Sequence, residues 1–227
     1  MNSNECWLYN NCTKVDCDKE FCLKQFKLNK LYELTLLSDI HKKDIQLRLD
    51  EDQRDKENFL FMKDIIQKID KFVERGENLY LHSFKSGNGK TTLSIRCIKA
   101  YLNKIWYKSD IKCRALFIHV PRFLLEMKQN ISKSSEYAQY ILDNALDADL
   151  VVFDEVATKG LSYFEFEHIL NIINTRIDQG KANIYTSNVS NDEFLENMGS
   201  RLYSRIVNNS IDVELFGEDK RGLFNKK

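Results

Sequence analysis

A chain of 227 residues with 43% hydrophobic residues is long enough for one full domain and a small additional one. No apolar run is long enough to cross a bilayer, and the polar N-terminus lacks the apolar centre of a secretion signal, which predicts a soluble, cytoplasmic protein with no membrane partner. The 34 basic and 34 acidic residues give a net charge of zero, but the charge is unevenly distributed along the chain.

Four of the six cysteines fall in the first 22 residues. In a cytoplasmic protein such clustering favours metal binding over disulfides. Four thiolates suit a tetrahedral structural zinc site, although their spacing contains no Cys-x-x-Cys pair. The expected zinc ligands are Cys6, Cys12, Cys17 and Cys22. His41 is a possible substitute ligand, although a lone histidine in a charged segment is more often a surface residue. The other two cysteines, Cys97 and Cys113, are expected to be small core residues.

Two helices are predicted after the cysteines. Apolar residues at helical spacing predict a helix over 26–37, packed on the zinc module. The charged segment 50–58 is interpreted as a linker or as a solvated helix start. A second apolar pattern predicts one helix over 59–73, which ends at Arg75-Gly76.

A glycine-rich loop follows, between the apolar run Leu79-Tyr80-Leu81 and a helical pattern over 91–107. A strand, such a loop and a helix N-terminus form a cradle for phosphate, in which a lysine reaches the outer phosphates and a hydroxyl meets Mg²⁺. Lys90 and Thr91 are expected to have these two roles. The alternative is a turn that only caps a helix, because the usual first glycine is replaced by Phe84, which would restrict the backbone. The predicted phosphate-binding residues are Ser86, Gly87, Asn88, Gly89, Lys90, Thr91 and Thr92.

An acidic pair closes a second apolar run, Leu150 to Asp154. This pattern is typical of a buried parallel strand with chemistry at its carboxyl end, although alone it could be an ordinary solvated strand end. With the loop, it predicts that Asp154 holds Mg²⁺ and that Glu155 polarises the water that attacks ATP. Adjacent strand residues point to opposite faces, so both can serve one site only if the strand has ended by Glu155.

Between residues 85 and 133 the chain has eleven basic residues and only two acidic ones, Asp110 and Glu126. Aromatic residues are interleaved with them, a combination that suits single-stranded nucleic acid. The alternative is that the aromatics are core and the cations merely solvated. The basic residues are Lys85, Lys90, Arg96, Lys99, Lys104, Lys108, Lys112, Arg114, Arg122, Lys128 and Lys133; the aromatics are Tyr101, Trp106, Tyr107 and Phe123.

Strand and helix patterns alternate through the rest of the chain, which predicts an α/β fold with a parallel sheet covered on both faces. Ligands then lie at the carboxyl ends of the strands. The expected strands are 79–83, 115–120, 150–154, 183–186 and 211–216. The expected helices are 91–107, two around Phe123 and Ala138, 163–177, 191–198 and one from Arg201.

The order of four motifs resembles the AAA+ ATPases of the DnaC/DnaI helicase-loader family, including phage versions, over about residues 76 to 222. These motifs are the loop at 86–92, the strand and acidic pair at 150–155, Ile184-Tyr185-Thr186-Ser187-Asn188, and the segment 199–206. The cysteine-rich start is similar to the zinc-binding region of DnaI-type loaders. The resemblance implies an AAA+ P-loop core with a five-stranded parallel sheet, preceded by a small helical zinc module.

Further roles come from the resemblance alone. Asn188 matches the sensor residue that orients the attacking water, Arg205 matches the arginine finger that acts in a neighbouring subunit, and Arg201 is a second candidate. Arg221 is a weaker match to a second sensor. The alternatives are a turn residue for Asn188 and a solvated helix face for the arginines at 201 and 205. Only 22 residues follow Arg205, so a truncated lid is expected.

The resemblance implies an ATPase that uses ATP, Mg²⁺ and Zn²⁺ to load a hexameric replicative DNA helicase onto single-stranded DNA, through self-assembly into an oligomer. Its expected divisions are a zinc-binding, helicase-contacting module at 1–50, a linker helix at 51–75 and an ATPase domain at 76–227. Two alternatives are a transposition regulator of the IstB type and a nucleotide-gated adaptor with little hydrolysis.

Overall fold

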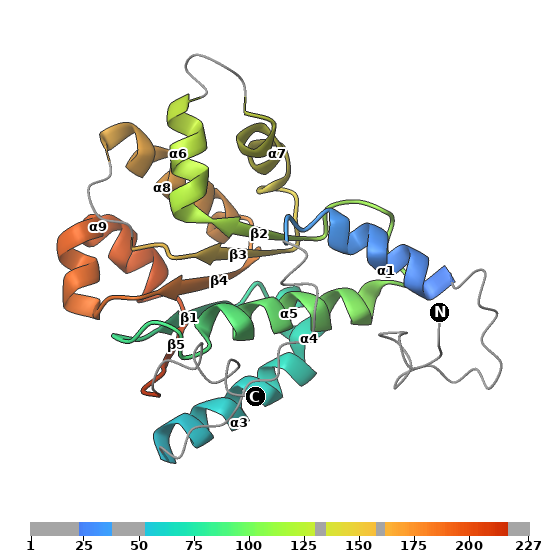
Figure 1. Cartoon of the computed structure of the whole chain (residues 1–227), viewed down its shortest axis with the longest axis horizontal. Coiled ribbons are helices and arrows are strands. Elements are labelled where there is room, and N and C mark those ends of the chain that lie inside the picture. Colours follow the sequence, from blue (N-terminus) through green and yellow to red (C-terminus); the bar gives the residue numbers. More distant parts are fainter. Residues whose placement is uncertain (1–22, 38–52, 130–134, 158–161, 218–227) are drawn as a thin grey trace, which may run out of the picture.

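The computed structural model describes residues 23–37, 53–129, 135–157 and 162–217 of the chain (Figure 1). The cysteines expected to bind zinc, His41, Lys133 and Arg221 lie outside these ranges. Across the described ranges, no helix is both long and apolar enough to cross a membrane.

The centre of the fold is a sheet of five parallel strands in the order β2-β3-β4-β1-β5. The strands β1 (Asn78–His82), β3 (Leu150–Asp154) and β4 (Ala182–Ser187) are buried along their whole length, as expected for apolar strands covered on both faces. The edge strands are β2 (Ala115–His119) and β5 (Ile211–Glu214). The predicted α/β fold with a five-stranded parallel sheet is therefore confirmed.

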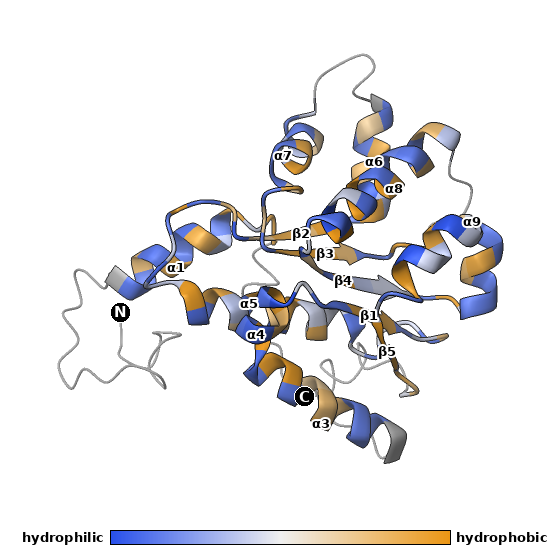
Figure 2. Ribbon diagram, turned by 180° about the vertical axis from the view of Figure 1, so that it is seen from behind, coloured by the Kyte–Doolittle hydropathy of each residue, from blue (hydrophilic) through white to orange (hydrophobic). Residues whose placement is uncertain are grey.

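Helices cover both faces of this sheet (Figures 1 and 2). One core is formed by α1 (Leu23–Glu33), α3 (Gln53–Gln67), α4 (Ile69–Glu74) and α5 (Lys90–Ile105). The other is formed by α6 (Val120–Gln129), α7 (Glu136–Asn144), α8 (Tyr163–Asp178) and α9 (Asn191–Ile206). Strand residues alternate between them: Leu79 and Leu81 enter the first core, and Tyr80 enters the second.

The prediction of one helix over 59–73 was wrong because the structure has two helices there, whereas the interpretation of 50–58 as a helix start is confirmed. The helix begins earlier, at Gln53, and Lys68 interrupts it with φ −108° and ψ 23°, which separates α3 from α4. The segment interpreted as a solvated start contains Asp55, which is fully buried. Conversely, the break expected between two helices near residue 199 is confirmed, because Gly199 at φ 72° and ψ 165° kinks α9.

The segment 26–37 was expected to pack on the zinc module. Its residues Leu28, Leu31 and Leu37 are buried in the core beside α5, and packing on the cysteine-rich start stays a prediction because residues 1–22 lie outside the described ranges. The Thr35 carbonyl accepts the Phe117 N–H at 2.8 Å, which joins the turn after α1 to strand β2. The division into domains stays a prediction, as does the truncated lid, because residues 218–227 are not described.

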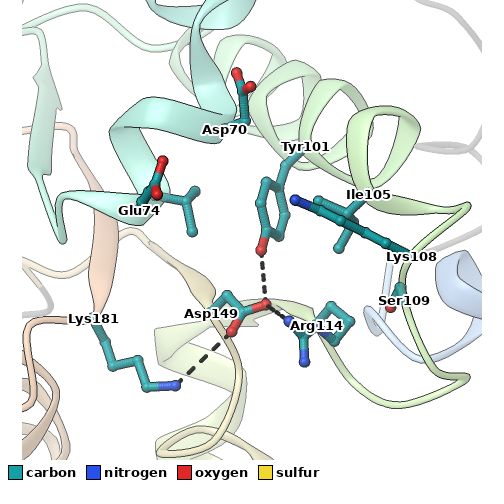
Figure 3. A pocket seen from close by; sticks show the side chains of 10 residues that line it. Asp70, Glu74, Tyr101, Ile105, Lys108, Ser109, Arg114, Asp149 and Lys181 are labelled. Atoms are coloured by element: carbon teal, nitrogen blue, oxygen red, sulfur yellow. Dashed lines mark hydrogen bonds and ion pairs between the residues drawn. The ribbon is translucent and has the colours of Figure 1, made fainter.

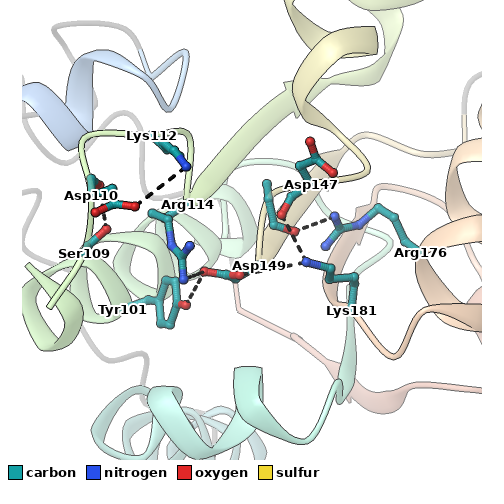
Figure 4. A network of polar contacts seen from close by, with 10 residues as sticks. Tyr101, Ser109, Asp110, Lys112, Arg114, Asp147, Asp149, Arg176 and Lys181 are labelled. Carbon is teal, nitrogen blue, oxygen red and sulfur yellow. Dashed lines mark hydrogen bonds and ion pairs between the residues drawn. The ribbon is translucent and has the colours of Figure 1, made fainter.

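A buried arginine holds the amino ends of the strands together (Figure 4). The Arg176 side chain is fully buried and donates to the Ala145 carbonyl, to the Ala148 and Ala182 carbonyls at 2.8 and 2.7 Å, and to Asn183 Oδ1 at 2.6 Å. Burial lowers the pKa of Arg176 to about 10, so the guanidinium is still charged near neutral pH. One side chain therefore satisfies three backbone carbonyls, two from the turn before β3 and one at the start of β4.

We expect Arg176→Met to lower the free energy of unfolding by about 3–5 kcal/mol, because it leaves buried oxygen acceptors without donors. Arg75→Met is the matched control: this arginine is exposed and pairs with Glu77 at 3.3 Å, so a change within about 0.5 kcal/mol is expected. Urea denaturation of the two variants measures both values. Equal stability of the two variants would contradict the role given to Arg176.

Candidate functional site

The loop between β1 and α5 has the backbone of a phosphate cradle. Gly87 and Gly89 have φ angles of 75° and 114°, in the left-handed region that favours glycine. Among the described non-glycine residues only Leu36 and Glu155 have positive φ, so Phe84 does not occupy such a conformation. Its side chain is 76% exposed. The backbone conflict expected at Phe84 is therefore absent.

Lys90 begins α5 and is only 5% exposed. Its ammonium donates to the Lys85 carbonyl at 2.9 Å and to Asn88 Oδ1 at 3.2 Å. Both acceptors are neutral oxygens of the loop itself. Phosphate oxygens at this place would offer stronger, charge-assisted bonds, so the residues present suit an anionic phosphate group.

Asp154, the last residue of β3, lies directly across from this helix start. Its Oδ1 accepts hydrogen bonds from Thr91 Oγ1 at 2.9 Å and from Thr186 Oγ1 at 2.8 Å. The two residues predicted to hold Mg²⁺, Thr91 and Asp154, are therefore in direct contact. A hydroxyl and a carboxylate are hard oxygen ligands of the kind Mg²⁺ prefers, so the donor set fits this ion.

Glu155 leaves the strand at once. Its φ of 59° turns the chain, so its carboxylate lies at the same edge of the sheet as that of Asp154. Its N–H donates to Thr186 Oγ1 at 3.0 Å, and its Oε1 accepts from Asn188 Nδ2 at 3.2 Å. The structure thus brings together the predicted pair Glu155 and Asn188, beside Asp154.

The sequence interpretation missed two residues of this edge. Thr186 bridges the Asp154 carboxylate and the Glu155 backbone. His119, the last residue of β2, has Nδ1 3.5 Å from Asp154 Oδ2, and the hydrogen bond with Asp154 raises the pKa of His119 above its usual value. Thr186 ends the strand predicted over 183–186, and His119 lies one residue before the end of the strand predicted over 115–120. That position was the available signal, because parallel strands place their last residues at one edge.

The other predicted residues are not joined to this edge. Arg201 and Arg205 lie on α9 and pair with α8, through Glu167 at 3.7 Å and Asp178 at 4.0 Å. Of the described residues, no three His, Cys, Asp or Glu side chains form a metal-binding group. Cys97 is buried and Cys113 is partly buried, as expected, and burial raises the pKa of these thiols to about 12 and about 11.

The basic segment is not one surface. Lys85 and Lys90 belong to the loop, Lys104 to Arg114 lie at and beyond the opposite end of α5, and Arg122 and Lys128 are on α6. Of the aromatics, Tyr101 and Phe123 are core residues. Tyr107, at 65% exposure, is available for contact with a partner.

A pocket of about 360 Å³ lies at the other edge of the sheet, where the strands begin (Figure 3). Its central carboxylate, Asp149, is bound by Tyr101 Oη at 2.7 Å and Arg114 Nη2 at 2.8 Å, with Lys181 Nζ at 3.9 Å. Asp70, on its rim, pairs with Lys104 at 2.6 Å, which lowers the pKa of Asp70. These charges compensate one another within the protein, and the pocket is separate from the loop.

Solved structures with this fold include replication proteins. The chain is similar to the crystal structure of the DnaC helicase loader, with a TM-score of 0.63 at 18% sequence identity over 79% of this chain and 100% of that one. It is similar to the crystal structure of DnaI, with a TM-score of 0.59 at 16% identity over 80% and 96% of the two chains.

A third match is the replication initiator DnaA bound to AMPPCP and single-stranded DNA, with a TM-score of 0.54 at 16% identity over 74% of this chain and 49% of that one. The sequence matches no protein-family model and no curated protein. At these identities the similarity concerns the fold, and it confirms the expected structural resemblance to DnaC and DnaI loaders.

We expect Lys90→Ala to weaken ATP binding about 100-fold or more, because two charge-assisted bonds to phosphate are lost. Titration with a fluorescent ATP analogue measures the affinity. Lys104→Ala, at the other end of the same helix, is the control and should bind within about twofold of the unaltered chain. Unchanged affinity of Lys90→Ala would refute the assignment of the loop.

Proposed function

We propose that this protein is an ATP-dependent loader of a hexameric replicative DNA helicase onto single-stranded DNA. The observation that carries the proposal is the meeting of a glycine loop, a buried lysine and the Thr91–Asp154 contact at one edge of a parallel sheet. Several kinds of protein could have such an edge. Among them, the similarity to the DnaC and DnaI structures over most of the chain supports a helicase loader.

The proposed chemistry is hydrolysis of ATP. Lys90 binds the outer phosphates, and the backbone of Ser86 to Gly89, with Thr92, lines the rest of the cradle. Thr91 and Asp154 hold Mg²⁺, which when bound supplies positive charge that stabilises the phosphates. Glu155 accepts a proton from the attacking water, and Asn188 orients that carboxylate through the contact with Oε1.

Arg205, with Arg201 as a second candidate, is proposed to reach the site of a neighbouring subunit. Both are exposed on α9, and their long ion pairs with α8 are weak enough to exchange for a phosphate partner. Arg221 is proposed as an additional nucleotide contact. Activity would then require an oligomer, which explains why the chain does not bring these arginines to its own loop.

The region before α3 is proposed to contact the helicase. Its Cys6, Cys12, Cys17 and Cys22 would bind one structural Zn²⁺, with His41 as a substitute ligand. The zinc content of the purified chain measures this, and a value well below one per chain would refute a four-cysteine site.

The two alternative functions predict different experimental results. An IstB-type regulator should form persistent filaments on duplex DNA but not on single strands. A nucleotide-gated adaptor should keep its activity when hydrolysis is removed. The positive φ angles of Gly87 and Gly89 and their absence at Phe84 favour nucleotide binding, and the contact of Asn188 with Glu155 favours hydrolysis over a purely nucleotide-gated adaptor.

We expect Glu155→Gln to bind ATP within about twofold of the unaltered chain but to lower phosphate release about 100-fold or more, because the amide cannot accept the water proton. Release is measured with single-stranded DNA and the cognate replicative helicase, both of which should stimulate the unaltered chain. Glu136→Gln, in the first turn of α7, is the control and should hydrolyse normally. Helicase loading that persists in Glu155→Gln would favour the adaptor.

We expect Arg205→Ala to bind ATP normally and to lose ATPase activity and assembly. A mixture of Arg205→Ala with Lys90→Ala chains should recover part of the activity, since each variant supplies the residue that the other lacks. No recovery at any mixing ratio would contradict a role in trans.

A further inference from the structure

The side chain of Asn88 makes hydrogen bonds that a phosphate cradle does not need. Its side chain is fully buried, its Oδ1 accepts from Lys90 Nζ at 3.2 Å, and its Nδ2 donates to the Leu215 carbonyl at 3.1 Å and to Ser83 Oγ. A phosphate cradle uses backbone N–H groups, for which this side chain is not needed. The amide therefore joins the phosphate-binding lysine to the segment after β5.

That segment is tied in turn to α3. The Phe216 N–H donates to Asp55 Oδ1 at 2.8 Å, and Asn58 Nδ2 donates to the Glu214 carbonyl. The Leu215 N–H donates to the carbonyl of His82 at 2.9 Å. His82 is the last residue of β1, so the segment 214–216 is also bound to the strand that leads into the loop. Hydrogen bonds thus run without a gap from Lys90 through Asn88 and residues 214–216 to α3.

The carboxylate that accepts this last hydrogen bond is only half satisfied. Asp55 is fully buried, its Oδ1 accepts from the Phe216 N–H, and its Oδ2 has no hydrogen-bond partner among the described residues. A buried carboxylate oxygen without a donor raises the free energy of the arrangement that contains it. A displacement of Phe216 that breaks the bond to Oδ1 therefore leaves both oxygens without a donor and favours a new position of Asp55 and of α3.

We propose that Asn88, the segment 214–216 and Asp55 are a relay that couples nucleotide binding at the loop to the position of α3. It rests on the proposed nucleotide site and adds its regulation. When Lys90 turns to phosphate oxygens it gives up Asn88 Oδ1, and the freed amide loosens its bond to the Leu215 carbonyl. The hydrogen bonds of Asn88 therefore differ between the empty and the nucleotide-bound loop. A ligand shifts a conformational equilibrium only through such a difference in interactions between the two states.

The relay gives a function to the one buried polar residue that the structure describes in α3, Asp55. Residues 1–50, the region proposed to contact the helicase, directly precede this helix in sequence. A change in the position of α3 can therefore be passed along the chain to that region. Asn88 and Asp55 are positioning residues in this scheme, since neither donates to or accepts from the reacting atoms.

The test is hydrogen exchange of the full chain with and without saturating AMPPCP. In the unaltered chain the analogue should slow exchange in residues 83–90 and change it about twofold or more in residues 53–67 and 214–216. In Asp55→Ala the loop response should remain and the α3 response should disappear. Asp55→Asn, which keeps the Oδ1 acceptor, should restore it. Asp64→Ala, on the exposed face of the same helix, is the control and should respond normally.

The outcomes separate the two hypotheses. An α3 response that persists in Asp55→Ala, or one that is absent in the unaltered chain while the loop is protected, overturns the relay and leaves the nucleotide site intact. No loop protection and no AMPPCP binding overturn the nucleotide site and the relay with it. If Asp55→Ala does not fold, Asn88→Ala at saturating analogue serves instead, and an α3 response in that variant overturns the relay.

Discussion

The candidate site depends on one carboxylate oxygen. Asp154 Oδ1 accepts from Thr91 at the start of α5 and from Thr186 on β4, while the other oxygen faces His119 at the end of β2. Hydrogen bonds to a charged group contribute about 1.5–3 kcal/mol each, roughly twice a neutral one. Asp154 therefore fixes three elements around the loop before any nucleotide is present, and the positions of Glu155 and Asn188 follow from it through Thr186.

The strand order makes that convergence possible. β1 lies between β4 and β5, and β3 lies between β2 and β4, so the segments that follow β1, β3 and β4 all leave the sheet at its carboxyl edge. At the opposite edge, where the strands begin, Arg176 and Asp149 form hydrogen bonds and ion pairs within the protein. The polar groups of that edge therefore stabilise the fold, and the candidate site lies at the carboxyl edge.

Much of this fold could be predicted from local pattern. The run from Leu150 to Phe153 is apolar throughout because the strand is covered on both faces, and the adjacency of Asp154 and Glu155 demands a turn that the φ of Glu155 provides. The break at Lys68 could not be predicted, since no glycine or proline marks it and buried Ile65 and Ile69 continue the helical spacing across it. Buried Asp55 was also missed, because its partner Phe216 is 161 residues away.

The same distinction explains which site residues were found. Lys90, Thr91 and Asp154 have roles set by a few neighbouring residues and by a general rule about strand ends. The local sequence identifies Asn88 only as a residue of the loop. Its hydrogen bond to the Leu215 carbonyl could not be predicted, because it depends on a segment 127 residues away. In the proposed nucleotide site, Lys90 exchanges two oxygens of its own loop for phosphate oxygens, so the nucleotide affinity is the difference between those two sets of bonds. In the proposed relay, a change in how tightly residues 214–216 hold Asn88 then changes this affinity, and by linkage nucleotide binding changes how tightly Asn88 is held.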